Sequence, residues 1–324
     1  MNLSKPTEFA AFCALSARLG QDPLRVQGPG GNTSIKSDGV MWIKASGTEL
    51  VDAETKDIFV PVDRAAALAE AQETAGDGSC KATVLDPQNT LRPSIETTFH
   101  AALDWEVVAH THSIATLTHG VSVDGRKAAW EKLAGLPAAF VPYAKPGLPL
   151  TREILARAEA QTQVFVLENH GLIVCGPDVA ETAALMEEVE TRLAMPELRG
   201  NRDRPQSAAP EGFDWAEESW IAGDTRAAAL ALAVSYYPDH VGFLGPALPP
   251  ADHGGAPPAV LVEAVGIALR DGATPSQKAM LRCLSDLLAR LPEDWTPLAI
   301  GEAAEAELLD WDAEKYRQAL AARS

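Results

Sequence analysis

The sequence has few basic residues and lacks the hallmarks of membrane or secreted proteins. Its 27 lysines and arginines are outnumbered by 45 aspartates and glutamates, for a formal net charge of −18. Such a chain lacks the basic clusters that bind nucleic acid or anionic membrane surfaces. No run approaches the ~18 apolar residues of a membrane span, and no basic leader with an apolar stretch opens the chain. These absences predict a cytoplasmic protein that binds neither nucleic acid nor membranes.

Cysteine is also scarce. The four cysteines are widely scattered and form no C-x-x-C pair, which indicates free thiols in a reducing compartment. A hydrophobic content of 46% supports a packed core. At 324 residues the chain is long enough for one large domain, or for a medium domain and a smaller one.

Two histidines close the apolar, strand-like run that ends in Val-Val-Ala-His110-Thr-His112. Side chains two apart in a strand lie on the same face, so His110 and His112 project together, as two ligands of one divalent metal would. A second apolar run, 164–168, is followed by Asn169, His170 and a glycine. Three neutral nitrogens at two strand ends suit zinc with an open catalytic position.

A short helix is predicted after Pro93, just before the first of these strands. Ser94 is the expected N-cap, which places Glu96 in the first helical turn. A carboxylate there either complements the helix dipole or belongs to a functional site. His100, four residues later on the same face, either orients that carboxylate or packs, partly buried, beside Phe99.

A glycine-rich loop, 27–32, precedes a predicted hairpin whose turn is Asp38-Gly39. Its glycines allow a backbone to approach a ligand closely, although they also suit a plain turn. With Asn32 and Ser46 nearby, backbone N–H groups in this loop could cradle an anion. Lys44 either neutralises that anion or is an ordinary lysine on a strand face.

Near-continuous apolar strands between helices predict a sheet covered on both faces. Residues 199–210 are rich in Arg, Asp and Pro and read as a linker. We therefore expect one domain over 1–212 and a small α/β region of unknown role over 213–324. The elements expected in that region are helices at 225–233, 275–291 and 301–321, a strand at 241–244, and strands around a bend within 260–270.

The segments described above together resemble the class II aldolase/adducin family, which includes fuculose- and rhamnulose-phosphate aldolases and ribulose-phosphate 4-epimerases. The match covers roughly residues 8 to 195, and the joint order and spacing of its motifs make it specific. The motifs are Gly30-Gly31-Asn32-Thr-Ser, Ala45-Ser46-Gly47, Pro93-Ser94-Ile-Glu96, His110-Thr-His112 and Asn169-His170-Gly171-Leu. The resemblance implies a three-layer α/β/α fold with a mainly antiparallel central sheet, whereas the apolar strands alone favour a parallel one.

The resemblance also implies roles for individual residues. Glu96 corresponds to a catalytic carboxylate that completes the metal site at rest and exchanges protons during the reaction. The implied metal is Zn²⁺ or another divalent ion such as Mn²⁺, Co²⁺ or Fe²⁺, with His110, His112 and His170 as its ligands. The positions that match the family's substrate-phosphate site are Gly31, Asn32, Ser46, Gly47 and Ser94.

The implied activity is that of a metal-dependent aldehyde-lyase, which cleaves a sugar or sugar-phosphate ketose by retro-aldol chemistry through a metal-stabilised enediolate. Alternatives are a sugar-phosphate 4-epimerase or a 3-keto-acid decarboxylase on the same site, and a non-enzymatic, adducin-like interaction module. Ile95 and Pro29 stand where phosphate-binding members often carry hydroxyls, which weakens the case for a phosphorylated substrate. The tyrosine acid of the fuculose-phosphate aldolases has no counterpart within 128–136. No G-x-G-x-x-G loop is present, so we expect no dehydrogenase activity, and the family's assembly implies a homotetramer.

Overall fold

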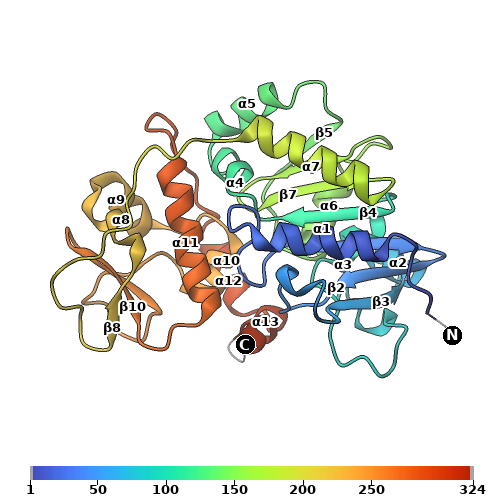
Figure 1. Cartoon of the computed structure of the whole chain (residues 1–324), viewed down its shortest axis with the longest axis horizontal. Coiled ribbons are helices and arrows are strands. Elements are labelled where there is room, and N and C mark those ends of the chain that lie inside the picture. Colours follow the sequence, from blue (N-terminus) through green and yellow to red (C-terminus); the bar gives the residue numbers. More distant parts are fainter. Residues whose placement is uncertain (1–2, 322–324) are drawn as a thin grey trace.

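The computed structural model describes residues 3–321 and is built around a seven-stranded sheet (Figure 1). The strand order is β3-β2-β1-β4-β7-β6-β5. Neighbouring strands pair antiparallel, apart from β5 and β6, which are parallel. The mainly antiparallel sheet is thus confirmed. The strands are β1 (Asn32–Ser37), β2 (Val40–Lys44), β3 (Phe59–Asp63), β4 (Val107–Thr111), β5 (Ala138–Val141), β6 (Val164–Leu167) and β7 (Gly171–Gly176).

Helices cover both faces of this sheet, which gives the three layers (Figure 1). On one face lie α1 (Phe9–Gln21) and α7 (Val179–Leu193). On the other lie α2 (Arg64–Ala71), α3 (Thr97–Ala102) and α6 (Leu148–Leu155). Two more helices, α4 (Ile114–Gly120) and α5 (Val123–Lys132), follow β4.

The central strands are apolar on both sides, as the sequence predicted. Along β6, Val164 and Val166 pack into the core under α1 and α7, whereas Phe165 and Leu167 pack into the core beneath α3 and α6. This alternation follows from the two-residue repeat of a strand. It places His110 on the α3 side of β4, where its ring meets that of Phe99 edge-on at 5.9 Å.

A charged side chain of β1 is buried in the sheet. Lys36 on β1 is 6% exposed, and its ammonium group donates hydrogen bonds to the carbonyl oxygens of Leu103 (2.9 Å) and Trp105 (2.6 Å). Burial disfavours the charged form and lowers the pKa of Lys36 from 10.5 to about 7. These two hydrogen bonds connect β1 to the segment that follows α3.

Residues 213–321 form a smaller unit beside the sheet domain (Figure 1). Its antiparallel sheet has the order β8-β10-β9. The strands are β8 (Phe213–Trp215), β9 (Ala259–Val262) and β10 (Gly266–Arg270). The helices are α8 (Trp220–Gly223), α9 (Thr225–Ala233), α10 (Pro238–Leu244), α11 (Pro275–Arg290), α12 (Glu302–Leu309) and α13 (Asp312–Ala321).

The smaller unit shares a hydrophobic core with the sheet domain. Ile114 and Leu117 of α4 belong to the same buried cluster as Leu284 and Leu288 of α11. The two helices pack against each other directly. Residues 194–212 connect the units without a helix or strand. The boundary at 212/213 stays a prediction.

One local prediction is wrong. The strand expected at 241–244 is part of α10, because Pro238 occupies the first turn and presets the helical φ. His119 lies in α4 and donates from Nδ1 to the carbonyl oxygen of Ala115 (2.8 Å). That helix begins directly after β4 because the Ser113 hydroxyl accepts a hydrogen bond from Thr116 N. Among residues 3–321, no helix is long and apolar enough to cross a membrane.

Candidate metal centre

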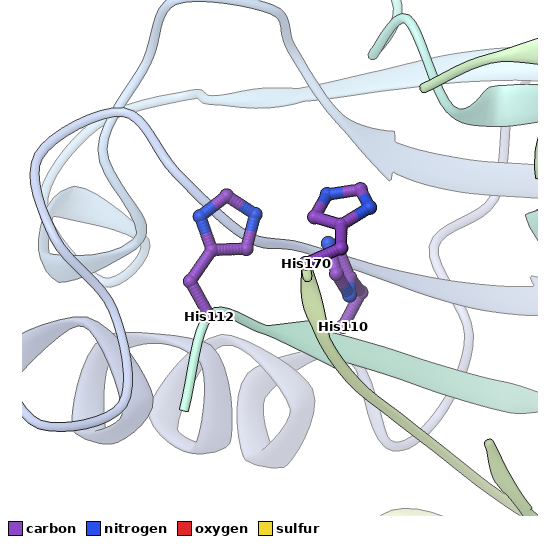
Figure 2. Close-up of side chains that lie close together, drawn as sticks. All are labelled: His110, His112 and His170. Atoms are coloured by element: carbon purple, nitrogen blue, oxygen red, sulfur yellow. The ribbon is translucent and has the colours of Figure 1, made fainter. Parts of the chain in front are cut away.

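Three histidines from two neighbouring chain segments converge at one edge of the sheet (Figure 2). His110 lies near the end of β4, His112 directly follows that strand, and His170 lies in the turn between β6 and β7. One nitrogen from each ring lies within 4.8 Å of the others, and all three side chains are buried. Antiparallel pairing of β4 with β7 causes this convergence, because it sets the start of β7 beside the end of β4.

The turn that carries His170 is tightly constrained. A β-carbon added at Gly171 would lie 2.2 Å from the carbonyl oxygen of Thr111, so only glycine allows this approach of the two strands. Asn169 adopts a left-handed φ of 54°. Its side-chain amide donates to the carbonyl oxygens of Tyr236 (2.9 Å) and Leu298 (2.8 Å). The turn is therefore anchored on both sides of His170.

The hydrogen bonding of His110 leaves one nitrogen for a ligand. Its Nδ1 lies 3.0 Å from the carbonyl oxygen of Leu172, which can only accept, so Nδ1 carries the proton. Its Nε2 is buried and has no hydrogen-bond partner among the described residues. Burial lowers the pKa of His110 to about 4, although the nearby Glu96 carboxylate opposes this effect. The ring is thus neutral at pH 7, as a metal ligand must be.

The Glu96 carboxylate faces two of the histidines. Its Oε2 lies 3.5 Å from His110 Nε2, and its Oε1 lies 3.6 Å from His170 Nε2. Both distances exceed a normal hydrogen bond. Oε1 has no hydrogen-bond partner among the described residues although it is buried. A buried carboxylate opposite imidazole nitrogens, with space between them, fits a divalent cation.

A series of hydrogen-bonded polar side chains fixes the position of the Glu96 carboxylate. The Asn32 amide nitrogen donates to Glu96 Oε2 (2.8 Å), and the Asn32 carbonyl oxygen accepts from His100 Nε2. His100 Nδ1 in turn lies 2.8 Å from the Ser34 hydroxyl, which donates to it. Burial holds the pKa of His100 well below its usual value, so the ring is neutral and this direction of donation is consistent. His100 also stacks on Phe99 at 4.4 Å, as expected, but it is fully rather than partly buried, and it reaches Glu96 only through Asn32.

The Glu96 side chain can face the histidines because it makes no capping hydrogen bond to its own helix. The helix begins at Thr97, so Glu96 occupies the N-cap position expected for Ser94. The Ser94 hydroxyl accepts instead from the backbone N–H of Glu96 (3.2 Å). The carboxylate makes no capping hydrogen bond.

The structure brings the predicted substrate-binding residues to the same place. A small cavity contacts Glu96, His112 and His170 and is also lined by Gly31, Asn32, Ser46, Gly47 and Ser94. The buried Lys44 borders it and donates to the carbonyl oxygen of Pro29 (3.1 Å). The binding roles of these residues stay predictions.

A larger cavity of about 770 Å³ shares Ser46 and Ile95 with the small one. Two cations on its walls lie over aromatic rings of the C-terminal region. The Arg92 guanidinium lies 3.8 Å from the Tyr316 ring centre, and the Lys145 ammonium lies 4.9 Å from that of Trp311. The larger cavity is not lined by the histidines; it adjoins the small one at Ser46 and Ile95.

Sequence reasoning missed one charged neighbour of the histidines. Asp239, on α10, is buried and places Oδ2 3.1 Å from His112 Nδ1. Pro238 and Leu308, also from the C-terminal region, line the small cavity. No motif marks Asp239, because it lies far along the chain in a segment that resembled a turn before a strand.

Comparison with known proteins identifies the sheet domain. The model of the Class II Aldolase and Adducin N-terminal domain matches residues 8–195. The "Uncharacterized oxidoreductase YuxG" of Bacillus subtilis is 27% identical over 194 residues, which are 53% of this chain and 27% of that protein. A "3-oxo-tetronate 4-phosphate decarboxylase" of Escherichia coli is 40% identical over 63 residues, 19% of this chain and 30% of that enzyme. The chain thus spans less than a third of either relative.

Among solved structures, the N-terminal class II aldolase domain of a conserved protein from Thermoplasma acidophilum superposes with a TM-score of 0.52. It is 25% identical and covers 60% of this chain and 95% of its own. The region beyond residue 195 lies outside the match to the family model.

Proposed function

Because the chain belongs to the class II aldolase and adducin N-terminal domain family, we propose that it is a metal-dependent aldehyde-lyase. Its substrate would be a ketose or ketose phosphate, cleaved by retro-aldol chemistry. One observation carries the proposal: three histidines and a carboxylate meet at a buried site that opens on a small cavity. A protein that used the fold only as an interaction surface would not need these four groups to converge.

The metal would be held by His110, His112 and His170. Zn²⁺ suits three imidazoles, and Mn²⁺, Co²⁺ or Fe²⁺ would also fit neutral nitrogen ligands. A bound divalent ion supplies Lewis-acid polarisation of a carbonyl oxygen. The chain contributes a dry, fixed set of ligands, because the three rings are buried and the pairing of β4 with β7 holds their segments together.

Glu96 is the group proposed to move the proton. Its carboxylate is 3% exposed and lies beside the histidines, where a substrate carbon bound at the same point would be within reach. Asn32 and His100 keep it aimed there through hydrogen bonds. A general base or acid works only when it is held within hydrogen-bond reach of the proton that it transfers.

The substrate would occupy the small cavity and extend into the larger one. Backbone and hydroxyl groups of Gly31, Ser46, Gly47 and Ser94 line the first part of that route. The Asn32 amide donates a hydrogen bond to Glu96, so Asn32 would position this carboxylate in addition to contacting the substrate. The second part carries Arg92 and Lys145, which suit an anionic or hydroxylated chain end.

A second candidate is decarboxylation of a 3-keto acid at the same site. It is favoured by the 40% identity to the Escherichia coli 3-oxo-tetronate 4-phosphate decarboxylase over 63 residues. Loss of CO₂ from a 3-keto acid needs the same polarised carbonyl but no deprotonated hydroxyl. A sugar-phosphate 4-epimerase remains a third use of the same groups. The products separate these reactions: an aldehyde, CO₂ or an isomer.

The test begins with elemental analysis of the purified, dialysed protein. We expect about one divalent metal per chain in the wild type and in His253→Ala, whose histidine is exposed. His170→Ala should lose the metal. Ketoses, ketose phosphates and 3-keto acids would then be screened for aldehyde and CO₂ release. A wild type that holds no metal and acquires none from solution would refute the enzyme and favour an interaction module.

A further inference from the structure

The C-terminal region reaches the histidine site at two separate points. Asp239 places Oδ2 3.1 Å from His112 Nδ1. The carbonyl oxygens of Tyr236 and Leu298 accept both hydrogen bonds from the amide of Asn169, which immediately precedes His170. Two of the three histidines are therefore in contact with, or adjacent to, residues that the region 213–321 holds in place.

The position of Asp239 is set by a buried helix. Pro238 begins α10, and the side chains on both sides of Asp239 are buried. The hydroxyl of Tyr237 donates to the carbonyl oxygen of Met280 on α11 (3.3 Å), and α10 packs on α11. A carboxylate on such a helix presents a defined geometry to its neighbour, whereas one on an exposed loop does not.

The glycine-rich loop closes over this contact. A β-carbon at Gly30 would lie 2.8 Å from His112 Nδ1 and 3.1 Å from Asp239 Oδ2. Only glycine therefore lets the loop pass this close to the imidazole and the carboxylate. The loop shields His112 and Asp239 from water, and the electrostatic interaction between a carboxylate and an imidazole is stronger there than in solvent.

The orientation of the His112 ring matches this contact. Figure 2 shows one ring nitrogen turned toward the other two histidines and the second turned away from them. The nitrogen beside Asp239 is Nδ1, so Nε2 is the one that faces the site. A carboxylate at Nδ1 favours the proton there and leaves the Nε2 lone pair for a metal.

We propose that Asp239 is a positioning residue that fixes the tautomer and orientation of His112, and that the C-terminal region is therefore a structural part of the metal centre. This inference rests on the proposed metal site and adds a role for residues 213–321. His110 is fixed by a hydrogen bond to a backbone carbonyl, that of Leu172, whereas Asp239 faces His112 Nδ1 at ion-pair distance. His112 uses a carboxylate instead, and the sheet domain does not supply it.

The first test reads the tautomer of His112 in the metal-free, full-length protein. Long-range ¹H–¹⁵N NMR correlations distinguish a proton on Nδ1 from one on Nε2. At a pH where the ring is neutral, wild-type His112 should carry its proton on Nδ1, and Asp239→Ala should gain the Nε2–H form. A wild-type proton on Nε2 would overturn the inference, as would an unchanged tautomer in the variant. This measurement needs no bound metal, so it can fail or succeed independently of the proposed function.

The second test measures zinc affinity by competition with a chromophoric chelator. Removing such a partner of a metal-binding histidine weakens metal binding by about 10- to 100-fold. We expect this loss in Asp239→Asn, which keeps the shape of the side chain, and no change in Asp271→Asn, an exposed residue of the same region. Circular dichroism establishes that each variant is folded. Wild-type affinity in a folded Asp239→Asn would show that the carboxylate does not support the metal site.

Discussion

Replacing Lys36 by methionine should change how the stability of the protein depends on pH. Lys36 is buried in β1, and burial lowers its pKa from 10.5 to about 7. The unfolded chain therefore binds a proton at this residue more tightly than the folded one does. Stability must rise with pH wherever the unfolded state binds more protons, which for Lys36 is the range between about pH 7 and pH 10.5.

The size of the effect follows from the same two values. A pKa lowered from 10.5 to about 7 makes folding with a charged Lys36 less favourable by about 5 kcal/mol. About 2 kcal/mol of this penalty is relieved between pH 7 and pH 9. Lys36→Met also removes two hydrogen bonds, to Leu103 and Trp105, but that loss is nearly independent of pH.

Urea unfolding, followed by tryptophan fluorescence at pH 7, 8 and 9 on metal-free protein, gives the free energy of unfolding. The buried cysteines affect the pH dependence of both proteins. Subtracting the unfolding free energy of Lys36→Met from that of the wild type at each pH therefore removes most of the cysteine contribution. The difference should move in favour of the wild type by about 2 kcal/mol from pH 7 to pH 9. If the free energy of unfolding of the two proteins changed in parallel with pH, the argument that the fold destabilises the charged form of Lys36 would be refuted.

Three further predictions concern the site and the assembly. Glu96→Gln should keep its metal but lose cleavage by at least ~100-fold in kcat, since general acid–base catalysis contributes about that much or more; near-normal turnover would exclude Glu96 as the proton carrier. Gly171→Ala should destabilise the protein by about 1–3 kcal/mol and weaken metal binding, because its β-carbon would meet the Thr111 carbonyl oxygen. Gly223→Ala, where nothing lies within 4 Å of the added carbon, is its control, and equal melting temperatures would contradict the steric argument. Light scattering should show a homotetramer, and a monomer at micromolar concentration would exclude it.

The sequence predicted those parts of the site that depend on local repeats. His110 lies near the end of β4 and His112 directly follows it, so their common direction follows from the two-residue period of extended chain. Their convergence with His170 requires only that β4 and β7 be neighbours. The family resemblance added Glu96 and the antiparallel sheet. Apolar strands buried on both faces look alike in parallel and antiparallel sheets, which is why composition favoured the wrong arrangement.

What the sequence could not supply were contacts between distant segments. Asp239 lies in α10, just before residues 241–244, which were expected to form a strand because Val241 and its apolar neighbours have strand propensity. Packing of α10 on α11 overrides that propensity. The N-cap position of Glu96 was missed for a related reason. Ser94 has the better capping chemistry, but its hydroxyl is engaged by the N–H of Glu96, and the helix begins two residues later than capping propensity indicated.

The core shared by α4 and α11 bears on whether the sheet domain could exist by itself. Ile114, Leu117 and Val121 are buried against C-terminal leucines, so a chain shortened after residue 195 would expose them to water. The amide of Asn169 would lose both of its carbonyl partners at the same time. We therefore expect that the segment that fits the family model does not fold by itself in this protein. It should fold cooperatively with the C-terminal region, and the two would have to be inherited, transplanted or engineered as one unit.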